Sequence, residues 1–172
     1  MTPESAIDKG LRSCRHSALH LEMRDGYMLD DPDLAQWRRG YRHDPANRQS
    51  WWRPWLDLVA STTARGVSIR RARVVSEPVS EYIRFEYDVA FTNVEAGERL
   101  RWLPRRRAID IALPGNDFWL FDQEVLVINH FSGNGDWIDA ETIANPDVVR
   151  FCAKAFEAVW ERGVPHEEYQ PT

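Results

Sequence analysis

Several carboxylates and arginines of this sequence are candidates for acid–base chemistry or for ion pairing. The carboxylates are Glu77, Glu81, Glu86, Asp117 and Asp122. The arginines are Arg71, Arg73, Arg84 and Arg101. Two carboxylates that converge at a sheet edge can transfer protons or hold a metal ion. Salt bridges are the more common arrangement, because a buried guanidinium needs a carboxylate partner. We therefore expect ion pairs, with an acid–base pocket as the alternative.

Histidines are the other candidate proton-transfer groups. His130 follows Asn129 on a predicted strand and could act as a general base, but no Ser or Cys lies at a recognisable nucleophile elbow. His16 and His20 have the spacing of a zinc pair on a helix, yet Ser17 stands where the metalloprotease motif has Glu. We expect ordinary core, edge or solvated histidines, and the pattern indicates no metal or cofactor. If the protein is an enzyme, the acid–base residues are Asp117, Glu86 and His130.

Aromatic residues could form the walls of a ligand pocket, since the chain has eight Trp. Apolar walls with a few polar anchors are typical of small-molecule sites. The candidate ligand-binding residues are Arg73, Tyr82, Asp117, Trp119, Asp122, Trp52 and Trp55. Trp51 and Phe118 could complete the walls. A Trp-rich core is the alternative interpretation of the same pattern.

Length and composition indicate one globular domain of 172 residues, with 43% hydrophobic and 28% charged residues. The net charge of −5 disfavours direct nucleic-acid binding. Cys14 and Cys152 show no disulfide or ligand pattern, and no signal peptide or membrane-spanning run is apparent. We expect a cytoplasmic protein with a flexible N-terminus over residues 1–12, a domain over residues 13–164 and a tail over residues 165–172.

Apolar periodicity and caps predict the elements of this domain. Helices are predicted over residues 13–28, 30–37, 51–65 and 81–94, and from Asn145 to Gly163. Strands are predicted over 67–75, 99–103, 118–121 and 125–131. This order favours an α/β (α+β) fold, with a mixed sheet flanked by helices.

From residue 65 onward the chain resembles one half of a phospholipase D-like domain. The segments that carry the resemblance are residues 65–70, 121–127, 145–147 and 156–160. The catalytic motif of that family is His, any residue, Lys, four residues, Asp. Aligning Asp122 with the motif's Asp places Asp117 at the Lys and Gly115 at the His. The resemblance therefore implies a degenerate domain without the nucleophile and the phosphate-holding cation.

Most of residues 15–169 more closely resembles the actinobacterial family called domain of unknown function 6879. The segments that carry this resemblance are residues 21–25, 73–78, 96–98 and 117–122. The resemblance implies an actinobacterial cytoplasmic protein, in a family often encoded near helix-turn-helix regulators. It implies no established chemistry.

Three functions remain open from the sequence. We favour a non-catalytic ligand- or protein-binding module that acts in regulation with a protein partner, such as a helix-turn-helix regulator. The alternative is a small biosynthetic enzyme with a carboxylate–Arg pocket. Direct DNA binding through the arginines at 70, 71, 73 and 105–107 is a third interpretation, which the negative net charge disfavours. A homodimer is also expected, because a phospholipase D-like half usually pairs with a second.

Overall fold

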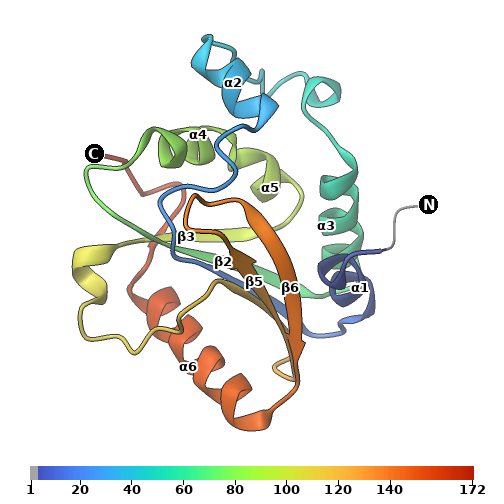
Figure 1. The fold of residues 1–172 in the computed structure, drawn as a ribbon. Coiled ribbons are helices and arrows are strands. Elements are labelled where there is room, and N and C mark those ends of the chain that lie inside the picture. Colours follow the sequence, from blue (N-terminus) through green and yellow to red (C-terminus); the bar gives the residue numbers. More distant parts are fainter. Residues whose placement is uncertain (1–3) are drawn as a thin grey trace.

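The computed structural model describes residues 4–172, which form a seven-stranded mixed sheet with helices on both faces (Figure 1). The strand order is β6-β5-β4-β1-β2-β3-β7. The strands are β1 (Ser17–Glu22), β2 (Ser68–Val75), β3 (Arg99–Pro104), β4 (Phe118–Phe121), β5 (Val125–Phe131), β6 (Trp137–Ile143) and β7 (Val164–Pro165). The adjacent strands β1, β2 and β3 run parallel, and the remaining neighbours pair antiparallel.

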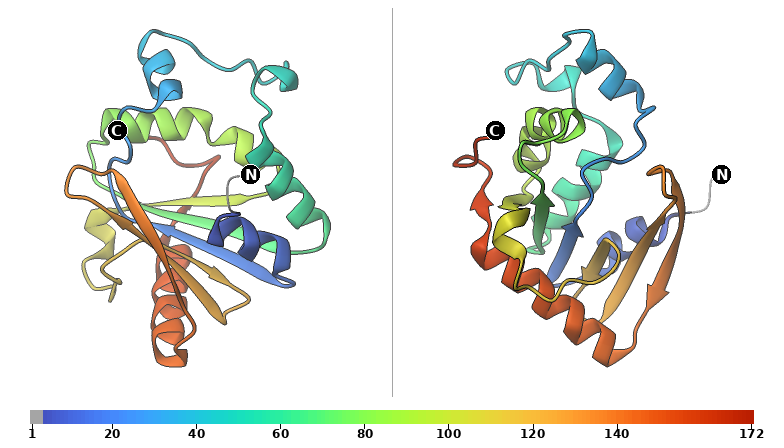
Figure 2. Two further views of the ribbon diagram at one scale, coloured as in Figure 1. Left: turned by 45° about the vertical axis from the view of Figure 1, so that its right-hand side comes forward. Right: turned by 60° about the vertical axis from the view of Figure 1, so that its left-hand side comes forward.

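The helices are divided between the two faces of this sheet (Figure 2). They are α1 (Ala6–Ser13), α2 (Pro32–Arg38), α3 (Pro54–Ala64), α4 (Glu81–Val89), α5 (Phe91–Glu95) and α6 (Pro146–Arg162), with short 3-10 turns η1 (Arg48–Ser50) and η2 (Arg105–Ala108). On one face, α6 buries Phe156 and Val159 against Leu19 and Val74. Residues of α1 and α3 pack on the other face, so each strand between them has two buried sides.

The long C-terminal helix begins and ends where the sequence predicts. Asn145 accepts hydrogen bonds from the N–H groups of Asp147 and Val148, and Pro146 occupies the first turn. Gly163 follows the last residue. The predicted helix over residues 81–94 is confirmed as α4 and α5, which meet at Ala90, with Ser80 as the N-cap. The mixed sheet and the predicted strands are also confirmed.

The prediction of a helix over residues 13–28 is wrong, because Ser17–Glu22 is the central strand β1. Strand β6 was not predicted. Of the expected flexible N-terminus over residues 1–12, residues 6–12 lie in α1, in which Leu11 is fully buried, and residues 1–3 lie outside the described residues. The expected C-terminal tail is packed as well: Tyr169 stacks on Trp102, with ring centroids 5.4 Å apart. Over residues 4–172, no helix is long and apolar enough to cross a membrane.

Candidate functional site

A group of charged side chains is buried on the sheet face opposite α6. In β1 and β2, side chains two residues apart lie on the same face. The parallel register pairs His20 with Arg71 and Glu22 with Arg73, so these four side chains are neighbours. Arg73 is 4% exposed and His20 is 7% exposed. The sequence therefore places four titratable groups where a strand of this kind would normally bury apolar residues.

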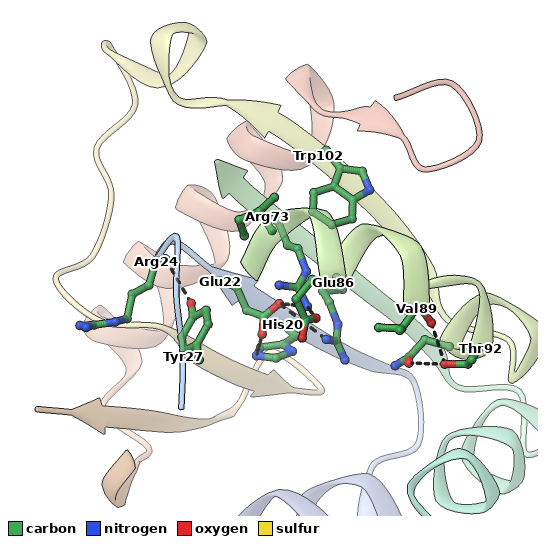
Figure 3. A network of polar contacts seen from close by, with 12 residues as sticks. His20, Glu22, Arg24, Tyr27, Arg73, Glu86, Val89, Thr92 and Trp102 are labelled. Atoms are coloured by element: carbon green, nitrogen blue, oxygen red, sulfur yellow. Dashed lines mark hydrogen bonds and ion pairs between the residues drawn. The ribbon is translucent and has the colours of Figure 1, made fainter. Parts of the chain in front are cut away.

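Glutamates from three elements surround the two arginines. Arg73 Nη2 lies 2.9 Å from Glu22 Oε2 and also contacts Glu86 of α4. Arg71 Nε donates to Glu98 Oε1 at 2.7 Å. Figure 3 shows Glu22, Arg73 and Glu86 pointing toward one another. Burial disfavours both charged guanidinium groups, but the glutamates around them raise the pKa of each arginine above its ordinary value.

Asp117, immediately before β4, lies on the same face and is 3% exposed. Its Oδ2 accepts a hydrogen bond from the Tyr27 hydroxyl, and its Oδ1 accepts one from the N–H of Met23 at 2.9 Å. Burial raises the pKa of Asp117 to about 6; the hydrogen bonds and Arg24 oppose the shift, and Glu22 adds to it. Within residues 4–172, no Arg, Lys or His forms an ion pair with this carboxylate.

His20 connects the charged group to the aromatic residues. Its ring stacks on Trp119, with centroids 4.2 Å apart. Burial, with the charges of Arg71 and Arg73, lowers the pKa of His20 well below its ordinary value, so the ring is neutral at pH 7. Its Nε2 lies 3.7 Å from Glu22 Oε1, and its Nδ1 has no hydrogen-bond partner.

Two adjoining hollows open over these residues. The aromatic cavity, of about 280 Å³, is lined by six aromatic side chains: Tyr27, Trp55, Tyr82, Trp119, Phe131 and Trp137. The arginine cleft, of about 410 Å³, is lined by Arg53, Arg71, Arg73 and Glu86, among others. Both hollows share Glu22, Trp55, Arg71 and Tyr82. Together they have the walls and polar anchors of a small-molecule site.

The structure brings together most of the residues that the sequence singled out as ligand contacts. Trp55 and Tyr82 line both hollows, Asp117 and Trp119 line the aromatic cavity, and Arg73 lines the arginine cleft. Glu86, an acid–base candidate, lines the arginine cleft and is paired with Arg73.

Asp122, Trp52 and His130 do not line either hollow. Asp122 follows β4 at the end opposite Asp117, and its carboxylate accepts the N–H groups of Arg15, His16 and Ser17 at 2.8–3.0 Å. Burial acts to raise the pKa of Asp122, but these hydrogen bonds hold it below its ordinary value. Trp52 donates to Asp57. His130 Nε2 lies 3.2 Å from Glu141 Oε2 on β6.

Sequence reasoning missed several contributors to the site, which are the aromatic residues Tyr27, Phe131 and Trp137 and the polar residues His20, Glu22 and Glu98. His20 and Glu22 alternate with buried Leu19 and Leu21, which is the pattern of a strand. That signal was missed because the segment was interpreted as helical. His16 lies outside β1, so the proposed zinc pair is not formed. Among residues 4–172, no group of three or more His, Cys, Asp or Glu side chains is arranged to hold a metal ion.

The arginines considered for DNA binding are mostly engaged within the protein. Arg70 forms two hydrogen bonds with Glu157, at 2.5 and 2.9 Å. Arg71 and Arg73 are buried. Arg105 donates to the carbonyl oxygens of Met23 and Val74. These four do not form an open basic surface.

Two solved structures share the fold of this chain at low sequence identity. The phospholipase D family member Nuc from Salmonella typhimurium is 9% identical, with a TM-score of 0.52, over 92% of this chain and 87% of that one. NucT from Helicobacter pylori is 10% identical, with a TM-score of 0.54, over 93% and 88%. The likeness shows a phospholipase D-like fold. No protein with a curated function matches the sequence.

The sequence profile of one family covers nearly the whole chain. It matches residues 5–171, a span that includes β1, β2, β4 and all the residues of the site. The chain therefore belongs to the family described as Domain of unknown function (DUF6879).

Proposed function

We propose that this protein is a non-catalytic binding module whose small-molecule ligand occupies the aromatic cavity and the adjoining arginine cleft, and that it serves in regulation. One observation carries the proposal: aromatic walls from six segments converge on buried charged groups in one concave site. Such convergence of apolar walls and a few polar anchors is typical of ligand sites.

The proposal that the site is non-catalytic is supported by the residues at the catalytic positions of the phospholipase D motif. Gly115 is exposed and has no side chain, and Asp117 is an acid where the motif has Lys. Three glutamates pair with the two buried arginines, so the charge of each arginine is already offset by carboxylates within the protein. We propose that the phospholipase D-like frame is degenerate here and that actinobacterial relatives share this loss.

A second candidate function, an enzyme with acid–base chemistry, is favoured by one specific observation. The pKa of Asp117 is about 6, and its Oδ2 contacts the Tyr27 hydroxyl in the aromatic cavity. A carboxyl group with this pKa can both accept and donate a proton near neutral pH. Of the other two proposed acid–base residues, Glu86 is ion-paired and His130 lies outside the site.

Native mass spectrometry tests the binding module most directly. Protein purified gently from an actinobacterial host is expected to retain a small-molecule mass. Trp55→Leu should reduce this retention, because Trp55 lines both hollows. Trp52→Leu is the matched control, since Trp52 is a neighbouring Trp that lines neither hollow.

The retained molecules, together with an activity assay of the wild type and Asp117→Asn, distinguish the possible functions. Chemical conversion of the retained molecule by the wild-type protein, abolished by Asp117→Asn, would establish the enzyme instead. Phosphodiesterase activity lost in Asp117→Asn would contradict the non-catalytic proposal. Retention of a helix-turn-helix protein would support the regulatory partner, which remains a prediction, as does the homodimer.

A further inference from the structure

The buried charges around the aromatic cavity do not balance. Arg71 and Arg73 face three glutamates, Glu22, Glu86 and Glu98, which leaves one carboxylate in excess. Asp117 adds another carboxylate, and Arg24, whose charge lowers the pKa of Asp117, packs over Phe131 with Cζ 5.5 Å from the ring centroid. A buried negative charge without a partner is costly, and a bound cation would offset this cost.

The side chains that line the aromatic cavity also carry an excess of negative charge. Asp8, Glu22 and Asp117 line it against one guanidinium, Arg71, which is paired with Glu98 and with Glu22. Six aromatic side chains form the walls around these carboxylates. Ring faces attract cations, and the attraction is strongest where water is excluded.

His20 supplies a second, independent indication of the ligand. The side chain is more than nine-tenths buried, lines the aromatic cavity and leaves Nδ1 without a hydrogen-bond partner. The ring is neutral, and its Nε2 is the nitrogen that faces Glu22, so the proton belongs on Nε2. Nδ1 is then an acceptor, and a ligand N–H group would satisfy it.

Other charged ligands fit this cavity less well. A metal ion needs a cluster of ligating side chains, and residues 4–172 hold none of the required kind. An anion would meet the excess carboxylates. Arg73, which has unpaired Nε and Nη1 atoms, lines the arginine cleft rather than the aromatic cavity, with its Cζ 5.4 Å from the Trp102 ring centroid.

We infer that the ligand of the aromatic cavity is a small organic cation with N–H groups, an amidinium, guanidinium or primary ammonium compound. The aromatic walls hold its body, Asp117 supplies the counter-charge, and His20 Nδ1 accepts one of its N–H groups. This inference rests on the proposed binding function and names the class of ligand. It reverses the charge preference expected of a phosphate-binding site.

A series of three probes with one shape and three charges tests the inference on the wild-type protein. Benzamidinium is a cation, benzamide is neutral and benzoate is an anion, and each has a planar ring with a planar substituent. Isothermal titration calorimetry should show benzamidinium binding about tenfold or more tightly than benzamide, and benzoate binding more weakly than either.

Variants then assign the binding to the cavity. Asp117→Asn should weaken benzamidinium binding about tenfold and leave benzamide unchanged, because only the charge is removed. Asp110→Asn is the control, as Asp110 is exposed and pairs with Arg162 outside the site. Trp55→Leu should weaken both probes, whereas Trp52→Leu should weaken neither. Circular dichroism checks that each variant is folded. The comparison of the three probes on the wild-type protein does not depend on the variants.

The pH dependence gives an independent readout. Burial raises the pKa of Asp117 to about 6; Tyr27, Glu22 and Arg24 also act on this carboxyl, and His20 lines the same cavity. Benzamidinium remains charged throughout, so its affinity should rise between pH 5 and pH 7 in the wild type and stay flat in Asp117→Asn.

The outcomes separate this inference from the proposed function. Equal binding of the three probes, or preference for benzoate, would overturn the inference while leaving a ligand-binding site. Absence of benzamidinium binding at millimolar concentration would overturn the inference as well. A small molecule retained in native mass spectrometry would then still support the binding module, and an anionic retained molecule would identify the opposite charge class.

Discussion

At Asp117, the protonated carboxyl is expected to favour folding, whereas the ionised carboxylate is expected to favour binding of a cation. The folded-state pKa of about 6 lies above the value of about 3.9 for an unfolded Asp. Between these values the folded protein holds a proton that the unfolded chain has lost. The free energy of unfolding therefore decreases as the pH rises from about 4 through about 6, by about 2–3 kcal/mol in total.

Asp117→Asn should remove this penalty. At pH 7 the free energy of unfolding of the variant is expected to exceed that of the wild type by about 2 kcal/mol, which also raises its unfolding temperature. This difference should vanish near pH 4. Asn keeps an oxygen that can accept the N–H of Met23. Thermal unfolding from pH 4 to pH 8 measures the effect, and a variant less stable than the wild type at pH 7 would contradict it.

Asp122, at the other end of β4, provides the contrast. Its carboxylate accepts three backbone N–H groups, and Asn can replace only part of that acceptor capacity. Asp122→Asn should destabilise the protein at pH 7 by about 1–2 kcal/mol. In the run from Asp117 to Asp122, the carboxylate at one end is thus a proposed binding residue and the carboxylate at the other end holds backbone N–H groups.

The packing of helix α1 predicts whether a substitution at Gly10 raises or lowers the stability of the protein. A glycine inside a helix is usually less stable than alanine by about 1 kcal/mol. At Gly10, however, an added Cβ would lie 2.3 Å from the ring of Phe121. Gly10→Ala should therefore destabilise the protein, by about 1–3 kcal/mol.

Chemical denaturation of Gly10→Ala measures this change. Gly133→Ala serves as a control for the substitution itself, because a Cβ at Gly133 meets nothing within 4 Å. A more stable Gly10→Ala variant would show that α1 is not packed on β4, as the original expectation of a flexible N-terminus implied.

The helices and strands differ in how well the sequence predicted them. Helix α6 was predicted because its cap, its first-turn Pro and its apolar face are all local signals. Strand β1 was missed because its sheet partners, β2 and β4, are distant along the chain. Its faces are covered by α6 on one side and by α1 and α3 on the other. Ala18 is apolar and buried like Leu19, so the alternation of apolar and polar residues is limited to residues 19–22 and was too short to outweigh the helical interpretation.

The candidate site was partly predictable for a related reason. Arg73, Tyr82, Asp117, Trp119 and Trp55 were identified from residue type, and the fold brings them to one cavity and its adjoining cleft. His20 and Glu22 depended on β1 and were lost with it. Edge strand β6 is exposed along nearly its whole length, so burial leaves no pattern in its sequence.

At the scale of the whole molecule, the C-terminal segment closes a third part of the core. Tyr169 is 4% exposed, stacks on Trp102 and donates to Glu77 from its hydroxyl. Tyr169→Ala should lower the free energy of unfolding by about 3 kcal/mol, measured by urea denaturation. A change below about 0.5 kcal/mol would mean that residues 165–172 are a loose tail in solution.

The central claim is that the aromatic cavity binds a small organic cation. Titration of 15N-labelled protein with benzamidinium, followed through its tryptophan indole N–H signals, tests this claim most directly. The account predicts saturable shifts for Trp55 and Trp119, which line the cavity, and unchanged signals for Trp160 on α6, across the sheet. Saturable shifts confined to Trp160, or no shift at any of the eight Trp residues, would contradict it.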